Sequence, residues 1–518
     1  MARYTMGEVK IEGNYPVIEL LEISMNVGAN RHGLLTYGGL VSEEAAKQYI
    51  RQSADEQVVK VSLRGDLEFC GYPQNIAVEH QNDHFFLRIT LATSSQLMDT
   101  DLHDRFFQNC KNSFENILTE AYEDSGTGSV VAIRGREEIR KPVLQYRETD
   151  WEFTLRMTGR NGTVVIPNIT SPEPQVALGI PNRSVIDEDN DSTYFISRNS
   201  ENYRHSFAAE TRFDGKYEKY GNHFVEPKEK YMLFENLSFH NFLCYEMRSN
   251  NRYKLGDSVR VDGKILTVME KSFTCDSGII EELYILGHEQ DFAVPFHHNK
   301  HITGLGLEGT VLSRAGQEMS ILLDIDITRK SGENTWFCYS PVTNNGMYSM
   351  PLPGEKVMLE WQSEADDDAL FICPMRRNGR ETLPPTHRHF LDEHDNHMKM
   401  IPNKIEYTNP TGSVVLLAGN GFDIFTGNRI EISAGQNVEI SSRKEVMAFS
   451  PERVTIHKYG AESSVDMVGE DIHIKAEDTV KGNSRANNYI RTILPKRSQG
   501  YSISASTAQK LAGAVPAF

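Results

Sequence analysis

Histidines and carboxylates gather in one short stretch of the chain, and their types are those of metal ligands. The stretch holds His387-Arg388-His389 and His394-x-x-His397, with Asp392, Glu393 and Asp395 between them. Imidazoles bind transition metals such as iron and nickel, so His387 and His389 are candidate ligands. The competing interpretation is surface or interchain hydrogen bonding in a polar connector, and the surrounding polar residues favour it.

Other chemistry finds less support in the residues. Scattered Asp and Glu could supply a glycosidase pair, but no pattern fixes two carboxylates at the required separation of about 5–10 Å. Aromatic sugar platforms are scarce, since the chain has 3 Trp in 518 residues. A net charge of -18 disfavours nucleic acid as a partner. We therefore expect no enzyme, no cofactor and no nucleic-acid site.

The chain between Val414 and Ile456 repeats an apolar-x-apolar pair every eight residues. Alternation at period two sends both members of a pair to one face of a short strand. Glycine, asparagine and proline fill the gaps as turn residues. The pairs are Val414/Leu416, Phe422/Ile424, Ile430/Ile432, Val438/Ile440, Val446/Ala448 and Val454/Ile456.

An eight-residue coil is too short for a single-chain β-helix, whose coils need roughly eighteen or more residues. Three identical chains wound about one axis would close such a coil, and the apolar pairs would then form the trimer core. Two histidines per chain on that axis would then offer six imidazoles, enough for an octahedral metal ion. The alternative is an antiparallel meander of tight hairpins packed on another domain.

The length predicts about three domains ahead of a tail. We expect two barrel-like β units with short helices at 1–300, a small closed barrel at 301–385, the octad repeat at 386–480 and a flexible tail at 481–518. Predicted strands include 58–62, 85–91, 258–261, 265–269 and 281–286 in the first region, and 319–327 and 357–361 in the second. The run Asp366-Asp367-Asp368 is interpreted as a solvated hairpin tip.

Helices are predicted at three places in the first region. Ser42 begins one, because Glu43 and Glu44 follow it. Apolar residues near helical spacing predict another over 102–122. Thr149 and Glu152 form a capping box that opens a third, which Gly159 or Gly162 would end.

Six widely spaced cysteines without a Cys-x-x-Cys pair suit reduced thiols. The first residues lack a basic-then-apolar signal segment, and no run of eighteen apolar residues occurs. We therefore expect the chain to fold in the cytoplasm and to leave it, if at all, through a dedicated machine.

Three stretches resemble the spike proteins of contractile injection systems, the VgrG proteins of type VI secretion and the hub-and-spike proteins of contractile phage tails. Residues 145–153 (QYRETDWEF) are similar to the family's Q-Y-x-E-[ST]-D-x-x-F helix start in the hub. Residues 351–357 (PLPGEKV), after Trp336-Phe337-Cys338, resemble the P-x-x-G-[DE]-x-V turn of the family's OB-fold barrel. The octads resemble its three-stranded β-helix.

The resemblance implies a mainly β homotrimer. Its hub would dock on a hexameric inner tube within a baseplate. An OB-fold barrel would follow the hub, and an intertwined β-helix needle would follow the barrel. It also implies a PAAR-type tip protein, effector or adaptor at the far end, and passage through a target membrane by mechanical penetration. Such a spike forms part of a particle that acts outside the cell or in a target. No lysozyme-like insertion or enzymatic extension is recognised. The alternative function is a trimeric tailspike that binds or degrades polysaccharide.

Overall fold

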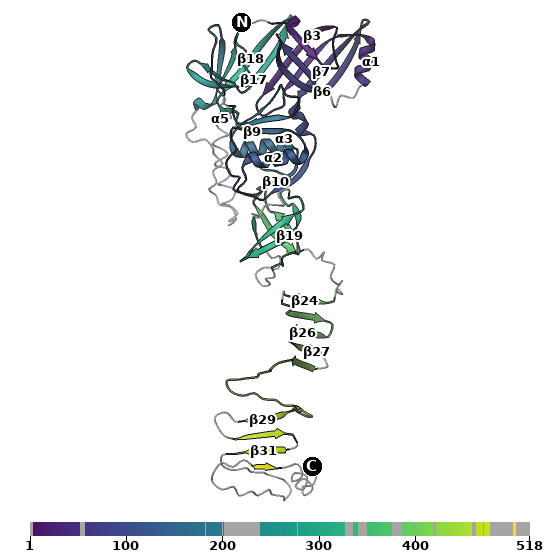
Figure 1. Cartoon of the computed structure of the whole chain (residues 1–518), viewed down its shortest axis with the longest axis vertical. Coiled ribbons are helices and arrows are strands. Elements are labelled where there is room, and N and C mark those ends of the chain that lie inside the picture. Colours follow the sequence, from purple (N-terminus) through teal and green to yellow (C-terminus); the bar gives the residue numbers. More distant parts are fainter. Residues whose placement is uncertain are drawn as a thin grey trace. The chain divides into compact units, whose positions relative to one another are not determined.

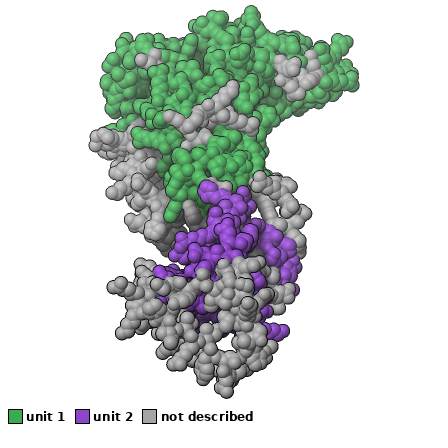
Figure 2. Space-filling view, turned by 60° about the horizontal axis from the view of Figure 1, so that its bottom comes forward, with its two compact units in different colours: residues 1–382 green, residues 383–518 purple. Residues whose placement is uncertain are grey.

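The computed structural model of the chain forms two compact units, unit 1 at residues 1–382 and unit 2 at residues 383–518 (Figure 2). Strands dominate both units, so the prediction of a mainly β chain is confirmed. None of the helices in the described part of the chain has the length and apolar character needed to cross a membrane. The structure describes residues 4–51, 57–181, 183–198, 200, 239–276, 278–326, 335–339, 350–374, 386–392, 394–417, 421–457, 463–469, 471–476 and 501–503.

Unit 1 begins with a 13-stranded sheet, most of it antiparallel (Figure 1). Its strands are β1 (Tyr4–Thr5), β2 (Val9–Glu12), β3 (Glu19–Gly28), β4 (Leu34–Val41), β5 (Val59–Leu63), β6 (Asp66–Gln81), β7 (His84–Thr93), β13 (Ile186–Asp187), β14 (Thr193–Arg198), β15 (Leu243–Arg248), β16 (Ser258–Val261), β17 (Lys264–Asp276) and β18 (Ile279–Gly287). The main order is β14-β15-β18-β17-β3-β4-β7-β6-β5-β2, with β1 on β18, β16 on β17 and β13 on β16. All five strands predicted for this region coincide with strands of the sheet.

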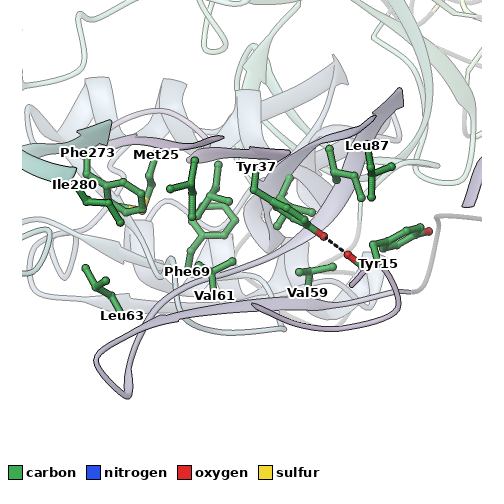
Figure 3. Packing of buried hydrophobic residues seen from close by; sticks show 14 of the residues in the cluster. Tyr15, Met25, Tyr37, Val59, Val61, Leu63, Phe69, Leu87, Phe273 and Ile280 are labelled. Carbon is green, nitrogen blue, oxygen red and sulfur yellow. Dashed lines mark hydrogen bonds between the residues drawn. The ribbon is translucent and has the colours of Figure 1, made fainter. Parts of the chain in front are cut away.

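The sheet has two halves that share β17. This strand pairs with β16 near its start and with β3 further along. Each half has its own core, which agrees with the predicted pair of barrel-like units. Tyr37 lies in the first core and its hydroxyl donates to the carbonyl of Tyr15 at 3.0 Å (Figure 3). The second core is lined by Tyr245, Met247, Val259, Leu266 and Tyr284.

A layer of helices and short strands follows the sheet in unit 1 (Figure 1). Its strands are β8 (His103–Phe107) paired with β10 (Val143–Glu148), and β9 (Ser129–Ala132), β11 (Val165–Pro167) and β12 (Gln175–Leu178) in a second small sheet. The helices of unit 1 are α1 (Glu43–Arg51), α2 (Phe114–Ser125), α3 (Asp150–Asn161) and α5 (Glu289–Phe292), with 3-10 turns η1 (Met6–Glu8), η2 (Ser94–Asp99) and η3 (Phe239–Phe242).

Two of the three helix predictions are confirmed. The Ser42 hydroxyl accepts from the Ala45 amide at the start of α1. The Thr149 capping box is present, and α3 ends at Gly162 with φ 58°. The helix predicted over 102–122 is wrong in its first half. Residues 103–107 are strand β8, held by pairing with β10, and the helix begins only at Phe114 behind the N-cap Ser113.

A small barrel completes unit 1. Its strands are β19 (Gly306–Ala315), β20 (Glu318–Leu323), β21 (Trp336–Cys338), β22 (Lys356–Trp361) and β23 (Ala369–Pro374), in the order β21-β20-β19-β22-β23. The edge strands β21 and β23 lie close together, so the sheet nearly closes. The strand predicted at 357–361 corresponds to β22, whereas β20 covers only 319–323 of the strand predicted at 319–327, whose last residue lies outside the described part. The core of this barrel also includes Phe106 of β8 and Leu144 of β10, which joins it to the helical layer.

Unit 2 contains two antiparallel meanders, the form that the sequence left open as the alternative. The first is β24 (Arg388–Leu391), β25 (His397–Ile401), β26 (Lys404–Asn409), β27 (Gly412–Leu417) and β28 (Gly421–Thr426). The second is β29 (Arg453–His457), β30 (Ser464–Val468), β31 (Asp471–Lys475) and β32 (Tyr501–Ile503). Residues 427–452 between them form no strand or helix in the single chain. Of the expected flexible tail, Tyr501–Ile503 pair with β31, and the other residues of 481–518 lie outside the described part.

Candidate functional site

The strand register of the first meander in unit 2 aligns mostly apolar residues in two rows, with Arg388 at one edge. Residues opposite one another on neighbouring strands share a face, so the register defines two rows across the five strands. Phe390, Tyr407 and Ile424 in these rows are 40%, 46% and 44% exposed, which shows that the described chain leaves this face uncovered. The rows are Phe390, Met398, Tyr407, Val414 and Ile424, and Arg388, Met400, Ile405, Leu416 and Phe422.

The opposite face of the same sheet is mostly polar. Its rows are His389, Lys399, Glu406, Val415 and Asp423, and Leu391, His397, Thr408, Ser413 and Phe425. The sheet is therefore amphipathic, like a sheet that packs on one side only.

The remaining predicted core residues lie further along unit 2, and most are strongly exposed. Between the meanders the exposed fractions are 51% for Ile430, 66% for Ile432, 51% for Val438, 71% for Ile440 and 59% for Val446. The last pair, Val454 and Ile456, lies on β29. It continues in register as Val454, Met467, Ile472 and Ile503, and as Ile456, Val465, Ile474 and Tyr501.

The structure thus places four of the eleven predicted core residues on paired strands of the first meander and two on a paired strand of the second, and leaves five without strand partners. Many of the described apolar side chains of unit 2 are therefore exposed, and exposed apolar side chains that cluster are typical of interaction sites.

The candidate metal ligands lie at the start of unit 2. The His387 ring stacks on the His389 ring at a centroid distance of 5.9 Å, and the His389 ring also meets the His397 ring at 4.8 Å. Within the described residues no three His, Cys, Asp or Glu side chains converge as a metal-binding group.

In unit 1, the QYRETD stretch builds a buried ion network around Arg105 of β8. The Arg105 guanidinium donates to Gln145 at 2.9 Å, to Asp150 at 2.5 Å and to Asp124 at 2.7 Å. Arg105, Gln145 and Asp150 are almost completely buried. A buried charge is costly unless it is paired, so these residues fix the start of α3 against β8 and β10.

A second buried arginine joins the helical layer to the barrel. Arg156 of α3 binds Glu148 through two bonds of 2.7 Å, and it binds Asp366 in the β22–β23 hairpin at 3.1 Å. Arg160, one turn later, also pairs with Asp366. The Asp366 carboxylate accepts from the amide of Leu144 at 2.9 Å as well. We name Glu148, Arg156, Arg160 and Asp366 the helix–barrel ion cluster.

The prediction of a solvated Asp366-Asp367-Asp368 tip is wrong. Asp366 is 1% exposed and Asp368 is 7% exposed, while Asp367 alone forms a partly exposed ion pair with Lys141 at 2.6 Å. The physical reason is that the tip contacts α3, which supplies two arginines. Arg156 and Arg160 are spaced i, i+4 on one face of that helix, which was the available signal.

His298 lies beside this cluster. Burial and the neighbouring guanidinium groups of Arg160 and Arg156 lower the pKa of His298 to about 4. The imidazole is therefore neutral near pH 7, which suits a position next to two fixed positive charges.

A third group of buried charges connects the two halves of the 13-stranded sheet. Lys271 of β17 pairs with Glu68 of β6 at 2.6 Å and with Glu282 of β18 at 3.2 Å. Arg252 also pairs with Glu68. Burial lowers the pKa of Lys271, and Glu282 opposes that shift. This group therefore joins the two halves of the sheet, as the helix–barrel ion cluster joins the helical layer to the barrel.

One arrangement in unit 1 has the residue types of a hydrolase triad. His32 lies 2.9 Å from the Ser95 hydroxyl and 3.5 Å from the Asp99 carboxylate. Ser95 is 1% exposed and also bonds Thr93, so its oxygen is inaccessible to a substrate carbonyl. Asp99 accepts from the Thr149 hydroxyl at the start of α3. These contacts position the helix, and the geometry required for nucleophilic catalysis is absent from the three residues.

Comparison with known proteins finds similarity of fold only. No model of a protein family matches the chain, and no curated protein does. Among solved structures, the chain is similar to a type VI secretion component of E. coli, itself described as similar to the bacteriophage T4 tail proteins gp27 and gp5. That pair is 11% identical with a TM-score of 0.46, over 71% of this chain and 99% of the other.

Two further solved structures are of the same kinds. The chain is similar to a chain of the lidded Francisella PdpA–VgrG complex, with 10% identity and a TM-score of 0.49 over 81% of this chain and 79% of the other. It is also similar to a 43 kDa tail protein of prophage MuSo2 from Shewanella oneidensis, with 9% identity and a TM-score of 0.38 over 56% and 98%.

Proposed function

We propose that the chain is the subunit of a homotrimeric spike and hub in a contractile injection system. The observation that carries this proposal is the uncovered apolar surface of unit 2, which recurs every eight residues from Val414 to Ile456. Three copies wound about one axis would turn each apolar pair toward the same pair of its neighbours. The core of such a needle consists of the eleven residues predicted from the sequence together with Ala448.

The energy available from that burial is large. A fully buried aliphatic side chain contributes roughly 1.5–3 kcal/mol relative to an exposed one. Five such side chains between the meanders are more than half exposed in the single chain. Over three chains, burial of these side chains would contribute tens of kcal/mol, and a monomer lacks this contribution. An intertwined trimer also has no free strand edges along its shaft, so it should resist unfolding under load.

Unit 1 supports the role of a hub. Its two sheet halves per chain would supply six similar elements in a trimer, which matches a hexameric inner tube. Force applied to the barrel passes to the hub through buried ion pairs and a shared hydrophobic core rather than through a flexible linker. The proposed partners on this side are the inner-tube protein and the baseplate.

At the far end, the proposed partner is a PAAR-type tip protein, an effector or an adaptor. The spike assembles in the cytoplasm, becomes part of a particle, and crosses a target membrane mechanically. In this proposal it needs no catalytic residue, no cofactor and no nucleic acid.

Co-purification with the inner-tube protein tests the hub role. The full chain and a truncated form ending at residue 384 are each mixed with that protein, and the complexes are isolated. We expect both forms to bind, with the truncated form losing heat resistance because it lacks the needle. A folded truncated form that fails to bind would contradict the assignment. Release of reducing sugar from capsule by the full chain would favour the tailspike alternative.

Deletion of residues 495–518 tests the proposed partner at the far end. The deletion removes β32 and the residues after it. We expect purified particles to recover less tip protein or cargo, while the needle itself still assembles. Unchanged recovery would remove this segment from the proposed interface.

A further inference from the structure

The hairpin of β24 and β25 brings two histidine nitrogens into direct contact. His389 Nδ1 and His397 Nε2 are 2.8 Å apart, and the two rings are tilted by 44°. Both side chains are half-buried, and both belong to the polar face of the sheet. The pairing was not expected from sequence, which associated His387 with His389 instead.

The separation of these nitrogens matches two ligands of one metal ion. A coordinated imidazole nitrogen lies about 2.0–2.1 Å from a divalent transition metal. Two nitrogens at right angles on one ion are then about 3 Å apart, whereas tetrahedral ligands are about 3.4 Å apart. The contact in this hairpin is closer to the right-angled case, which octahedral nickel and tetragonal copper prefer.

We propose that His389 and His397 form a two-nitrogen chelate for a divalent transition metal of the nickel and copper class. His389 binds through Nδ1 and His397 through Nε2, and water completes the coordination. The hydrogen bond between the rings gives way on binding, since both nitrogens then act as lone-pair donors. Strand pairing holds the two side chains in place, because Leu391 and His397 are direct partners and His389 is two residues from Leu391.

The register also decides where the site lies in an assembled spike. His389 and His397 lie on the face opposite Phe390, Met398 and Tyr407. If that apolar face turns toward the threefold axis, as proposed above, the histidine pair turns away from it. The site is then one per chain on the outside of the needle, rather than one shared ion on the axis. Only this stoichiometric argument rests on the proposed function.

Calorimetric titration of the untagged, metal-stripped full chain with nickel or copper chloride tests the proposal. We expect one ion per chain, and Kd raised about tenfold or more in both His389→Ala and His397→Ala. His387→Ala and the control His457→Ala, on the exposed β29 strand, should leave Kd within about twofold. Copper bound to the unaltered chain should show two nitrogen couplings in its electron paramagnetic resonance spectrum, reduced to one in either pair variant.

The outcomes separate this site from the proposed assembly. One ion per chain in a monomeric protein would support the chelate and contradict the trimer. One ion per three chains, or loss of binding in His387→Ala with no loss in His397→Ala, would overturn the chelate in favour of an axial site. Binding that no histidine variant changes would overturn both metal assignments.

Discussion

At the scale of single residues, Asp366 connects the barrel to the helical layer. Its carboxylate meets two arginines and one backbone amide in a buried position. None of these partners is near in sequence; Arg156 is 210 residues away. A run of three aspartates therefore looks like a solvated turn until the contact with α3 is known.

Replacement of Asp366 by alanine should strongly destabilise unit 1. Removing one partner of a buried ion pair leaves uncompensated charge and costs about 3–5 kcal/mol. The neighbouring Asp367→Ala is the matched control, because its pair with Lys141 is partly exposed and should contribute about 0–1 kcal/mol. Denaturant unfolding followed by tryptophan fluorescence measures both, since Trp151, Trp336 and Trp361 all lie in unit 1. Equal effects of the two substitutions would contradict a buried role for Asp366.

The stability of unit 1 should fall between pH 6.5 and pH 4 because of His298. An unfolded chain binds a proton at this imidazole near pH 6.5, but the folded chain does so only near pH 4. Between these values the unfolded state holds more protons, so lowering the pH favours unfolding, by at most about 3 kcal/mol. His298→Gln should flatten this part of the pH profile of unfolding free energy. His297→Gln, at the exposed neighbouring position, is the control and should leave the pH profile unchanged. If neither substitution alters the profile, other groups cause the pH dependence.

At the scale of elements, local signals predicted structure wherever the stabilising partners were local. The Thr149 capping box gave the start of α3, and strands with alternating burial such as β5 and β16 were recognised from their period. The helix predicted over 102–122 was wrong at residues 103–107, because Phe106 and Phe107 face two different cores across a strand. Residues 103–107 form a strand because they pair with β10, and the periodicity of the sequence does not indicate this long-range pairing.

Thr149→Ala should remove the N-cap hydrogen bond of α3 and destabilise unit 1. The Thr149 hydroxyl accepts from the Glu152 amide and donates to Asp99, so its loss should lower the free energy of unfolding by about 1–2 kcal/mol. Thr119→Ala within α2 is the control, because its hydroxyl only bonds a carbonyl in the preceding turn and should matter by less than about 0.5 kcal/mol. The same tryptophan-monitored unfolding gives both values. A Thr149 effect no larger than the Thr119 effect would remove the capping box from the account of α3.

At the scale of the whole molecule, unit 1 buries its apolar residues within one chain, whereas unit 2 leaves many of its described apolar residues exposed. Buried cores and paired charges account for the 13-stranded sheet, the helical layer and the barrel. Unit 2 instead exposes apolar residues at a period that the sequence alone reveals. The octads were predictable because they are local, whereas their arrangement in a single chain, as two meanders with an unpaired segment between them, was not. We propose that further copies of the same chain cover them.

The mass of the protein in solution, with and without charges in the octads, tests the central claim most directly. Ile432→Asp and Ile440→Asp together would place three charges at each level of the proposed axis, each costing several kcal/mol when buried unpaired. Ser433→Asp with Ser441→Asp is the matched control. Each serine directly follows one of the two isoleucines, so in the proposed strands its side chain faces away from the axis. Sedimentation equilibrium should give three chains for the unaltered protein and the serine control, and monomers or aggregates for the isoleucine variant. An intact, heat-resistant trimer of the isoleucine variant, or a monomeric unaltered chain, would contradict the account.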